Sequence, residues 1–177
     1  MKNMIDLNKK ILMILVVSFC SVAVYAQSGN FKEKTIGHVY KISIPGYMVE
    51  TNDLNDVATF QAQNTVKEAY VIVIEDSKVE LKKAGMKFRG SKDFFAAFEK
   101  DFTDKTTKKG KLKNLKINGY KAVQKEIAKK VNNLDIVYLV TVVESKTHFY
   151  KVVCWTLADR KDKLIADYAK IAASLKD

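Results

Sequence analysis

Apolar and polar residues alternate along the first half of the chain in a way that predicts short strands. Residues 36–44 alternate with a period of two, which predicts a strand, and Pro45-Gly46 then predicts a turn. Apolar segments predict further strands at 58–62 and 69–75. The second of these is apolar on both faces, as expected for a strand that is covered on both sides. Residues 78–88 fit a loop or a short helix.

An aromatic repeat predicts the first long helix, from Ser91 to about Asp104. Phe94, Phe98 and Phe102 recur every four residues, so they share one helix face. We expect Ser91 to act as the N-cap, because its hydroxyl can accept a hydrogen bond from a free backbone N–H of the first turn.

Four strands joined by short turns are predicted in the second half. Asn118-Gly119 is typical of a two-residue hairpin and joins strands 113–117 and 120–131. Asn132-Asn133 is a second candidate turn and leads into strand 134–143. The lysines of strand 120–131 predict that it turns a face to water. Strands at 134–143 and 148–157 are apolar on both faces, so helices are expected to cover both sides of the sheet.

The chain closes with a helix whose predicted buried stripe is Leu164, Tyr168, Ile171 and Leu175. Asp159 and Asp162 are expected to cap its start. Strands, helix, meander and helix in this order predict an α+β fold, an αβα sandwich with a mostly antiparallel sheet flanked by helices. The predicted domain spans 36–177 and follows a flexible lead over 27–35.

Residues 1–26 have the layout of a secretory signal peptide. A basic start at Lys2, Lys9 and Lys10 precedes an uncharged, mostly apolar run that ends at Ala26. Cleavage between Ala26 and Gln27 is expected, with export to the periplasm or the extracellular medium. The run of sixteen residues is shorter than the ~20 that span a bilayer as a helix.

Two alternatives to cleavage stay open. Uncharged residues continue through Asn30, which allows an uncleaved anchor. Cys20 allows a lipid anchor, although Phe19 stands where bacterial lipidation normally requires a small residue.

The composition predicts a basic domain that folds without a disulfide or a metal ion. Removal of residues 1–26 takes away three lysines and one aspartate and lowers the formal net charge from +11 to +9. A chain of this length buries about two-thirds of its unfolded surface, so it needs no disulfide or metal. Cys154 is then the single cysteine, and its apolar surroundings in the sequence predict a buried, inert thiol.

No known catalytic or metal-binding pattern is found in the sequence. His38 and His148, its two histidines, lie outside any metal-ligand spacing. No nucleophile elbow, phosphate-cradling glycine loop or dinucleotide fingerprint occurs. We therefore expect a domain without a cofactor that is not an enzyme, unless residues distant in sequence assemble a site in three dimensions.

Basic residues on either side of the aromatic helix are the candidate partner-binding set. They are Lys82, Lys83, Lys87, Arg89, Lys105, Lys108, Lys109, Lys111, Lys113 and Lys116. If they lie together in space, they form one positive region for lipid headgroups, acidic polysaccharide or an acidic protein. A generic solvated surface is the alternative interpretation. Nucleic acid is not expected, because export argues against it and the lysine-rich stretch 105–116 has no interleaved aromatic residues for base stacking.

Residues 40–47, Tyr-Lys-Ile-Ser-Ile-Pro-Gly-Tyr, resemble the opening strand and proline turn of the PsbP-like superfamily. The resemblance continues through strand 70–74, the helix start at 91–95, the hairpin at 117–120 and the closing helix. It implies an αβα sandwich that works as a binding or scaffolding module, without a catalytic centre.

The resulting hypothesis is an exported binding or scaffold domain that acts on an envelope protein or an anionic envelope component, with at most peripheral membrane contact. The alternative is a periplasmic carrier that holds a small apolar ligand between sheet and helix, with Phe94, Phe98 and Phe102 lining the pocket.

Overall fold

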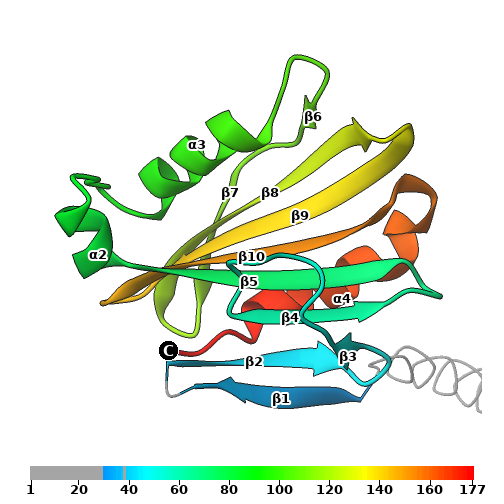
Figure 1. The fold of residues 1–177 in the computed structure, drawn as a ribbon, viewed down its shortest axis with the longest axis horizontal. Coiled ribbons are helices and arrows are strands. Elements are labelled where there is room, and N and C mark those ends of the chain that lie inside the picture. The colour runs from blue at the N-terminus through cyan, green and yellow to red at the C-terminus, as the bar shows by residue number, and fades with distance from the viewer. Residues whose placement is uncertain (1–29, 38) are drawn as a thin grey trace, which may run out of the picture. The chain divides into compact units, whose positions relative to one another are not determined.

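In the computed structural model, residues 30–37 and 39–177 are described (Figure 1). The predictions for the signal peptide, Cys20, the cleavage site Ala26-Gln27 and His38 lie outside these residues. The strands are β1 (Phe31–Ile36), β2 (Tyr40–Pro45), β3 (Val49–Glu50), β4 (Phe60–Asn64), β5 (Ala69–Ser77), β6 (Lys108–Lys109), β7 (Lys113–Ile117), β8 (Tyr120–Val131), β9 (Leu134–Glu144) and β10 (His148–Leu157). The helices are α2 (Lys78–Lys83), α3 (Ser91–Phe102) and α4 (Lys161–Ala173), the last preceded by a 3-10 turn, Ala158–Arg160.

One antiparallel sheet organises the domain. Its strand order is β3-β4-β5-β10-β9-β8-β6, and β7 pairs with the same outer edge of β8 as β6 does. β1 and β2 form a separate antiparallel hairpin, which is joined to the C-terminal segment by backbone hydrogen bonds between Lys41 and Lys176. The predicted α+β fold with a mostly antiparallel sheet is confirmed.

Both faces of the sheet are covered, as the two-sided apolar strands require. α3 and α4 lie on opposite sides of it (Figure 1). The α4 side, which the β1–β2 hairpin also covers, contains the larger core, with Ile42, Val71, Val152 and Ile171 fully buried. The α3 side holds an aromatic core: Phe94, Phe95, Val140, Phe149 and Val153.

Two predicted turns have the backbone that hairpins of two residues need. Asn118 and Gly119 have φ values of 48° and 91° between β7 and β8. Asn132 and Asn133 have φ values of 48° and 64° between β8 and β9. Asparagine and glycine tolerate positive φ better than other residues, so these turns fix the register of the meander.

The start of the domain differs from the prediction. The alternating residues 36–44 are not one strand, because β1 ends at Ile36 and Gly37 turns the chain with a φ of 54°. Residues 31–35, predicted to be part of a flexible lead, belong to β1 and pair with β2. The period-two pattern continues across the turn, and this concealed the hairpin.

Both predicted helix caps are wrong. Gly90, not Ser91, is the N-cap of α3, and Ser91 is its first residue. α4 begins after Arg160, and neither Asp159 nor Asp162 supplies a capping side chain. The start of α3 is instead satisfied by a residue from a distant strand, described below.

Residues 31–177 form one compact unit that contains both cores. Replacement of a core residue therefore tests the whole fold. For Ile171→Ala, which removes a fully buried side chain under the sheet, we expect a loss of about 2–5 kcal/mol in the free energy of unfolding. Urea denaturation measures it, with Val66→Ala at an exposed turn as the control that changes stability by less than about 0.5 kcal/mol. Equal losses in the two variants would contradict the assigned core.

Cys154 lies in β10 within the larger core, and its side chain is 1% exposed. Burial raises the pKa of its thiol well above the ordinary range, which disfavours the reactive thiolate. We expect no reaction with a thiol reagent such as Ellman's reagent in the native protein and complete reaction in denaturant. Rapid modification of the native protein would contradict the burial of this thiol.

Candidate functional site

The predicted basic residues lie at the two ends of α3 and along the outer edge of the sheet. Lys82 and Lys83 belong to α2, and Lys87 and Arg89 to the loop between α2 and α3. Lys105, Lys108 and Lys109 follow α3 in the loop and strand at its other end, and Lys111, Lys113 and Lys116 lie in or before β7. Figure 1 shows α2 and β6 at opposite ends of α3, so the helix separates the two groups.

The members of this set differ in whether a carboxylate neutralises them. Ion pairs join Lys83 to Glu80 at 2.8 Å, Arg89 to Asp93 at 3.6 Å and Lys109 to Glu99 at 3.7 Å. The other seven form no ion pair within residues 30–37 and 39–177, and all are exposed: Lys82, Lys87, Lys105, Lys108, Lys111, Lys113 and Lys116. The unpaired charges are therefore distributed over both ends of α3 and β7.

Not all of the set faces the same way. In β7, alternate residues point to opposite sides of the sheet. Lys116 is paired with Lys121 of β8, on the side of α3. Lys113 and Lys111 instead line a groove beside Ile165 of α4, on the other side. The prediction of one continuous positive region is thus wrong for Lys111 and Lys113.

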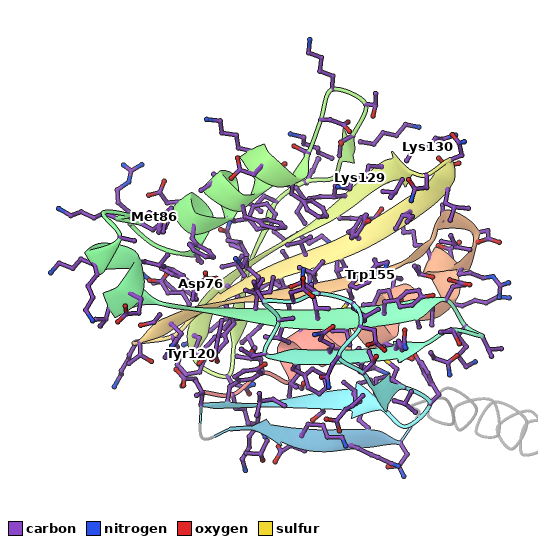
Figure 2. All side chains as sticks on the ribbon, viewed as in Figure 1. Asp76, Met86, Tyr120, Lys129, Lys130 and Trp155 are labelled. Atoms are coloured by element: carbon purple, nitrogen blue, oxygen red, sulfur yellow. The ribbon has the colours of Figure 1, made fainter. Side chains whose placement is uncertain are left out.

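Two lysines of β8 attach α3 to the sheet rather than facing water, which corrects the prediction for this strand. Lys125 Nζ lies 2.8 Å from both carboxylate oxygens of Glu99. Lys129 Nζ donates to the carbonyl oxygen of Phe102 at 2.9 Å and lies 3.9 Å from the centroid of its ring. Figure 2 shows Lys129 toward the β6 end of the domain and Lys130 at the tip of the β8–β9 hairpin.

The loop after α3 is held by Asp104. Its Oδ1 accepts hydrogen bonds from the backbone N–H and the hydroxyl of Thr106 and from the hydroxyl of Thr107. These hydrogen bonds lower the pKa of Asp104 to about 2. The loop therefore presents Lys105 from an ordered turn.

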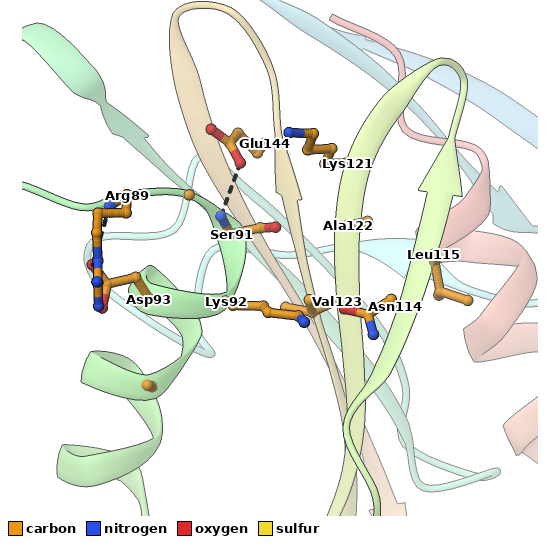
Figure 3. Close-up of a pocket in the computed structure, with 12 residues that line it drawn as sticks. Arg89, Ser91, Lys92, Asp93, Asn114, Leu115, Lys121, Ala122, Val123 and Glu144 are labelled. Atoms are coloured by element: carbon orange, nitrogen blue, oxygen red, sulfur yellow. Dashed lines mark hydrogen bonds and ion pairs between the residues drawn. The ribbon is translucent and has the colours of Figure 1, made fainter.

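A groove of about 790 Å³ lies between the first turn of α3 and strands β7 and β8 (Figure 3). We call it the α3–β8 groove; it is lined among others by Arg89, Ser91, Lys92, Asn114, Lys121 and Glu144. Glu144, at the end of β9, accepts a hydrogen bond from the backbone N–H of Ser91 at 2.9 Å and one from Lys78 Nζ at 3.0 Å.

Glu144 thereby caps α3 from a distant strand. Gly90, the N-cap residue, has no side chain for this task, and a Cβ at this position would lie 3.0 Å from Oε2 of Glu144. A carboxylate at a helix N-terminus is favoured by the free N–H groups and the helix dipole. The glycine at position 90 allows this carboxylate to approach the backbone.

The predicted pocket residues lie together beside a second groove. Phe94, Phe98 and Phe102 line it along α3, and its volume is about 390 Å³. Leu81, Met86 and Phe88 form its other wall, and Asp76 and Lys151 also line it. We call it the phenylalanine groove. Phe94 is 5% exposed and stacks on Phe149 at 4.5 Å between centroids, so its ring belongs mainly to the core.

Of the residues that line the α3–β8 groove, Arg89 belongs to the predicted basic set, and the others are not predicted as site residues. In the sequence, Ser91 and Lys92 indicate only a helix start, and Lys121 only a strand face exposed to water. Glu144 stands at the end of an apolar strand, where nothing in the pattern indicates that it reaches α3. Met86, 46% exposed, was also missed, and Figure 2 shows it beside α2.

His148 has an ordinary polar neighbour, since its Nδ1 lies 2.9 Å from the Thr147 hydroxyl oxygen. Within the part of the chain that the structure describes, no three His, Cys, Asp or Glu side chains are grouped as metal ligands would be. No helix in that part is both long and apolar enough to cross a membrane.

Comparisons with known proteins give structural matches only. No protein-family model matches the sequence, and no curated protein matches it. The solution structure of cyanobacterial PsbP (CyanoP) from Synechocystis sp. PCC 6803 superposes with a TM-score of 0.59 at 13% identity and covers 86% of this chain and 95% of its own. LpqN, involved in cell envelope biogenesis of Mycobacterium tuberculosis, superposes with a TM-score of 0.58 at 10% identity and covers 88% and 95%.

A protein of unknown function from Pseudomonas aeruginosa, PA94, described as a putative regulator, has a TM-score of 0.51 at 12% identity and covers 84% of this chain and 98% of its own. Identities this low speak for the fold and not for a shared activity. With the αβα sandwich and the near-complete coverage of CyanoP and LpqN, the chain has the PsbP-like fold.

Proposed function

We propose that the chain is an exported, non-enzymatic binding or scaffold domain that acts on an anionic component of the cell envelope. The observation that carries the proposal is the set of exposed lysines without ion pairs at both ends of α3, above all Lys82 and Lys87. The signal-peptide layout of residues 1–26 supports export. LpqN, a protein of the same fold, is involved in envelope biogenesis.

Apolar side chains among these lysines favour a lipid surface as the anionic component. Val79 on α2 is 60% exposed, and Met86 in the following loop is 46% exposed. Both lie in the same short segment as Lys82 and Lys87. Basic residues attract anionic headgroups, and exposed apolar tips gain free energy when they enter the headgroup region. Residues 79–87, which we call the basic segment, are therefore the proposed membrane-facing part.

Charge reversal in this segment tests the proposal. For the double variant Lys82→Glu with Lys87→Glu, we expect at least about tenfold weaker binding to phosphatidylglycerol-containing vesicles, because each lysine near an anionic surface contributes about 1 kcal/mol. Cosedimentation of residues 27–177 measures it. Binding of the unaltered protein should also fall as salt shortens the Debye length from about 30 Å to about 8 Å.

The matched control is Lys32→Glu with Lys163→Glu, an equal change of charge at exposed positions of β1 and of α4, where neither lysine forms an ion pair within the described residues. This control should retain most of the binding. An equal loss of vesicle binding in both double variants would contradict the proposal. So would equal binding of the unaltered protein to neutral phosphatidylcholine vesicles and to vesicles that contain phosphatidylglycerol.

A second candidate function is the carriage of a small apolar ligand, and the phenylalanine groove is the observation that favours it. Its volume of about 390 Å³ lies within the range of ligand sites, about 300–1,000 Å³. Phe98 and Phe102 stack at 4.9 Å between centroids and are partly exposed beside it. The phenylalanine groove is smaller than the α3–β8 groove, and we therefore rank the carrier function second.

Neighbouring alanines of α3 provide the test of the carrier. Ala97 lines the phenylalanine groove and Ala96 lines the α3–β8 groove, and both are exposed. We expect Ala97→Phe to fill the first groove and abolish the fluorescence enhancement of the neutral probe N-phenyl-1-naphthylamine, whereas Ala96→Phe preserves it. If the unaltered protein gives no enhancement, or if both variants respond alike, the carrier function is rejected.

A further inference from the structure

We propose that the α3–β8 groove binds the phosphate group of a sugar-sized ligand. The inference rests on the proposed function and names a site and a chemical group for it. Three features of the described residues carry it: two lysines that face each other without a counter-ion, a carboxylate that is engaged elsewhere, and the hydroxyl of a mostly buried serine that forms no hydrogen bond.

Lys116 of β7 and Lys121 of β8 are direct cross-strand partners. Side chains of directly opposed residues point to the same face of a sheet, here the face of α3. Like charges in this arrangement repel and destabilise the pairing of the strands. Neither lysine forms an ion pair with another residue of the described chain. An anion between them would relieve this repulsion.

The carboxylate that would neutralise Lys121 is bound to other groups. Glu144 of β9 is the cross-strand partner of Lys121 at the other edge of β8, the edge that does not pair with β7. Its two oxygens are instead held by the backbone N–H of Ser91 and by Lys78 Nζ, and Figure 3 shows the hydrogen bond to Ser91. The use of Glu144 as the cap of α3 thus leaves Lys121 without a partner at the groove.

The other acidic side chain of the groove is also engaged. Asp93 Oδ2 accepts a hydrogen bond from the backbone N–H of Arg89 at 3.0 Å and pairs with its guanidinium at 3.6 Å. The positive charges that stay available are those of Lys92 and Lys121, with Lys116 beside them. All three side chains are exposed to an incoming ligand.

Ser91 supplies the polar floor of the groove. The residue is 6% exposed, and its hydroxyl forms no hydrogen bond with any residue that the structure describes. Figure 3 shows this hydroxyl directed from α3 toward β8, into the groove. A hydroxyl that faces the groove and is not used inside the protein can donate to a ligand oxygen. The N–H groups of Lys92 and Asp93 have no acceptor within the first turn of the helix either.

These donors suit a phosphate better than a carboxylate. A phosphate monoester carries nearly two negative charges and three strong acceptor oxygens, so it can use two lysine ammonium groups and a hydroxyl at once, whereas a carboxylate offers one charge and two oxygens. The one arginine of the groove, Arg89, is already paired with Asp93. The volume of about 790 Å³ exceeds that of a phosphate ion and accommodates an attached sugar ring.

The test uses residues 27–177, labelled with nitrogen-15, and glucose 6-phosphate as the probe. We expect amide shifts at residues 90–93 and 121–122, and no shifts with glucose or glucuronate at the same concentration. Lys121→Ala should weaken binding by about tenfold and Ser91→Ala, which leaves the charge unchanged, by about fivefold, as expected for lost hydrogen bonds to a charged ligand. Lys130→Ala, an equal loss of charge at the far end of β8, should leave it unchanged.

Phosphatidylglycerol in vesicles forms the second arm and separates the sources of the phosphate. Shifts in the groove with both probes, or with the vesicles alone, support a phosphate site, the latter with a lipid headgroup as its source. The assignment is overturned if the groove residues shift with neither probe or shift equally with glucuronate. It is also overturned if Lys121→Ala binds glucose 6-phosphate as tightly as the unaltered protein. Vesicle binding that requires Lys82 and Lys87 but neither Lys121 nor Ser91 also rejects the groove while leaving the proposed function intact. Groove shifts with glucose 6-phosphate in a protein that binds no vesicles support the phosphate site and reject the membrane surface of the proposed function, and no response to either probe rejects both.

Discussion

Three neighbouring strands at the centre of the sheet, β5, β10 and β9, are apolar on both faces, and the rest of the domain is arranged to cover them. A strand of this kind exposes apolar surface to water on whichever side is left open, at about 25 cal/mol for each Å². α4 with the β1–β2 hairpin covers one side, and α3 with the loop before it covers the other. The sandwich follows from this burial, with β4 and β8 as the less apolar flanking strands.

The two helices are held to the sheet in different ways. α4 packs through apolar side chains such as Leu164 and Ile171, and Tyr168 donates to the backbone of Trp155 at 2.6 Å. α3 adds charged contacts to its aromatic face, through Glu99 to Lys125 and through Ser91 to Glu144. Both candidate sites lie along α3, the α3–β8 groove at its first turn and the phenylalanine groove along its aromatic face.

The same contacts determine which basic residues are available to a partner. Lys125 and Lys129 are used inside the structure, and Lys83, Arg89 and Lys109 are paired at the surface. Among the residues that the structure describes, no carboxylate pairs with four lysines on the side of the sheet that α3 covers: Lys82, Lys87, Lys92 and Lys121. Net positive charge alone promotes only nonspecific attraction. The selective pairing of the other lysines gives this side of the domain its candidate binding residues.

Local periodicity and turn chemistry were enough to predict the order of the main strands and helices after residue 58, the two hairpin turns at Asn118-Gly119 and Asn132-Asn133, and the covering of both sheet faces. The sequence also identified Phe94, Phe98 and Phe102 as one helix face. The β1–β2 hairpin was missed, since the alternation of residues 36–44 continues across the turn at Gly37. Only the tertiary structure decided which charges are free. Glu144 reaches Ser91 from 53 residues away, and Lys121 loses its cross-strand partner as a result. Such pairings depend on how strands and helices stack in space, and no local pattern in the chain encodes them.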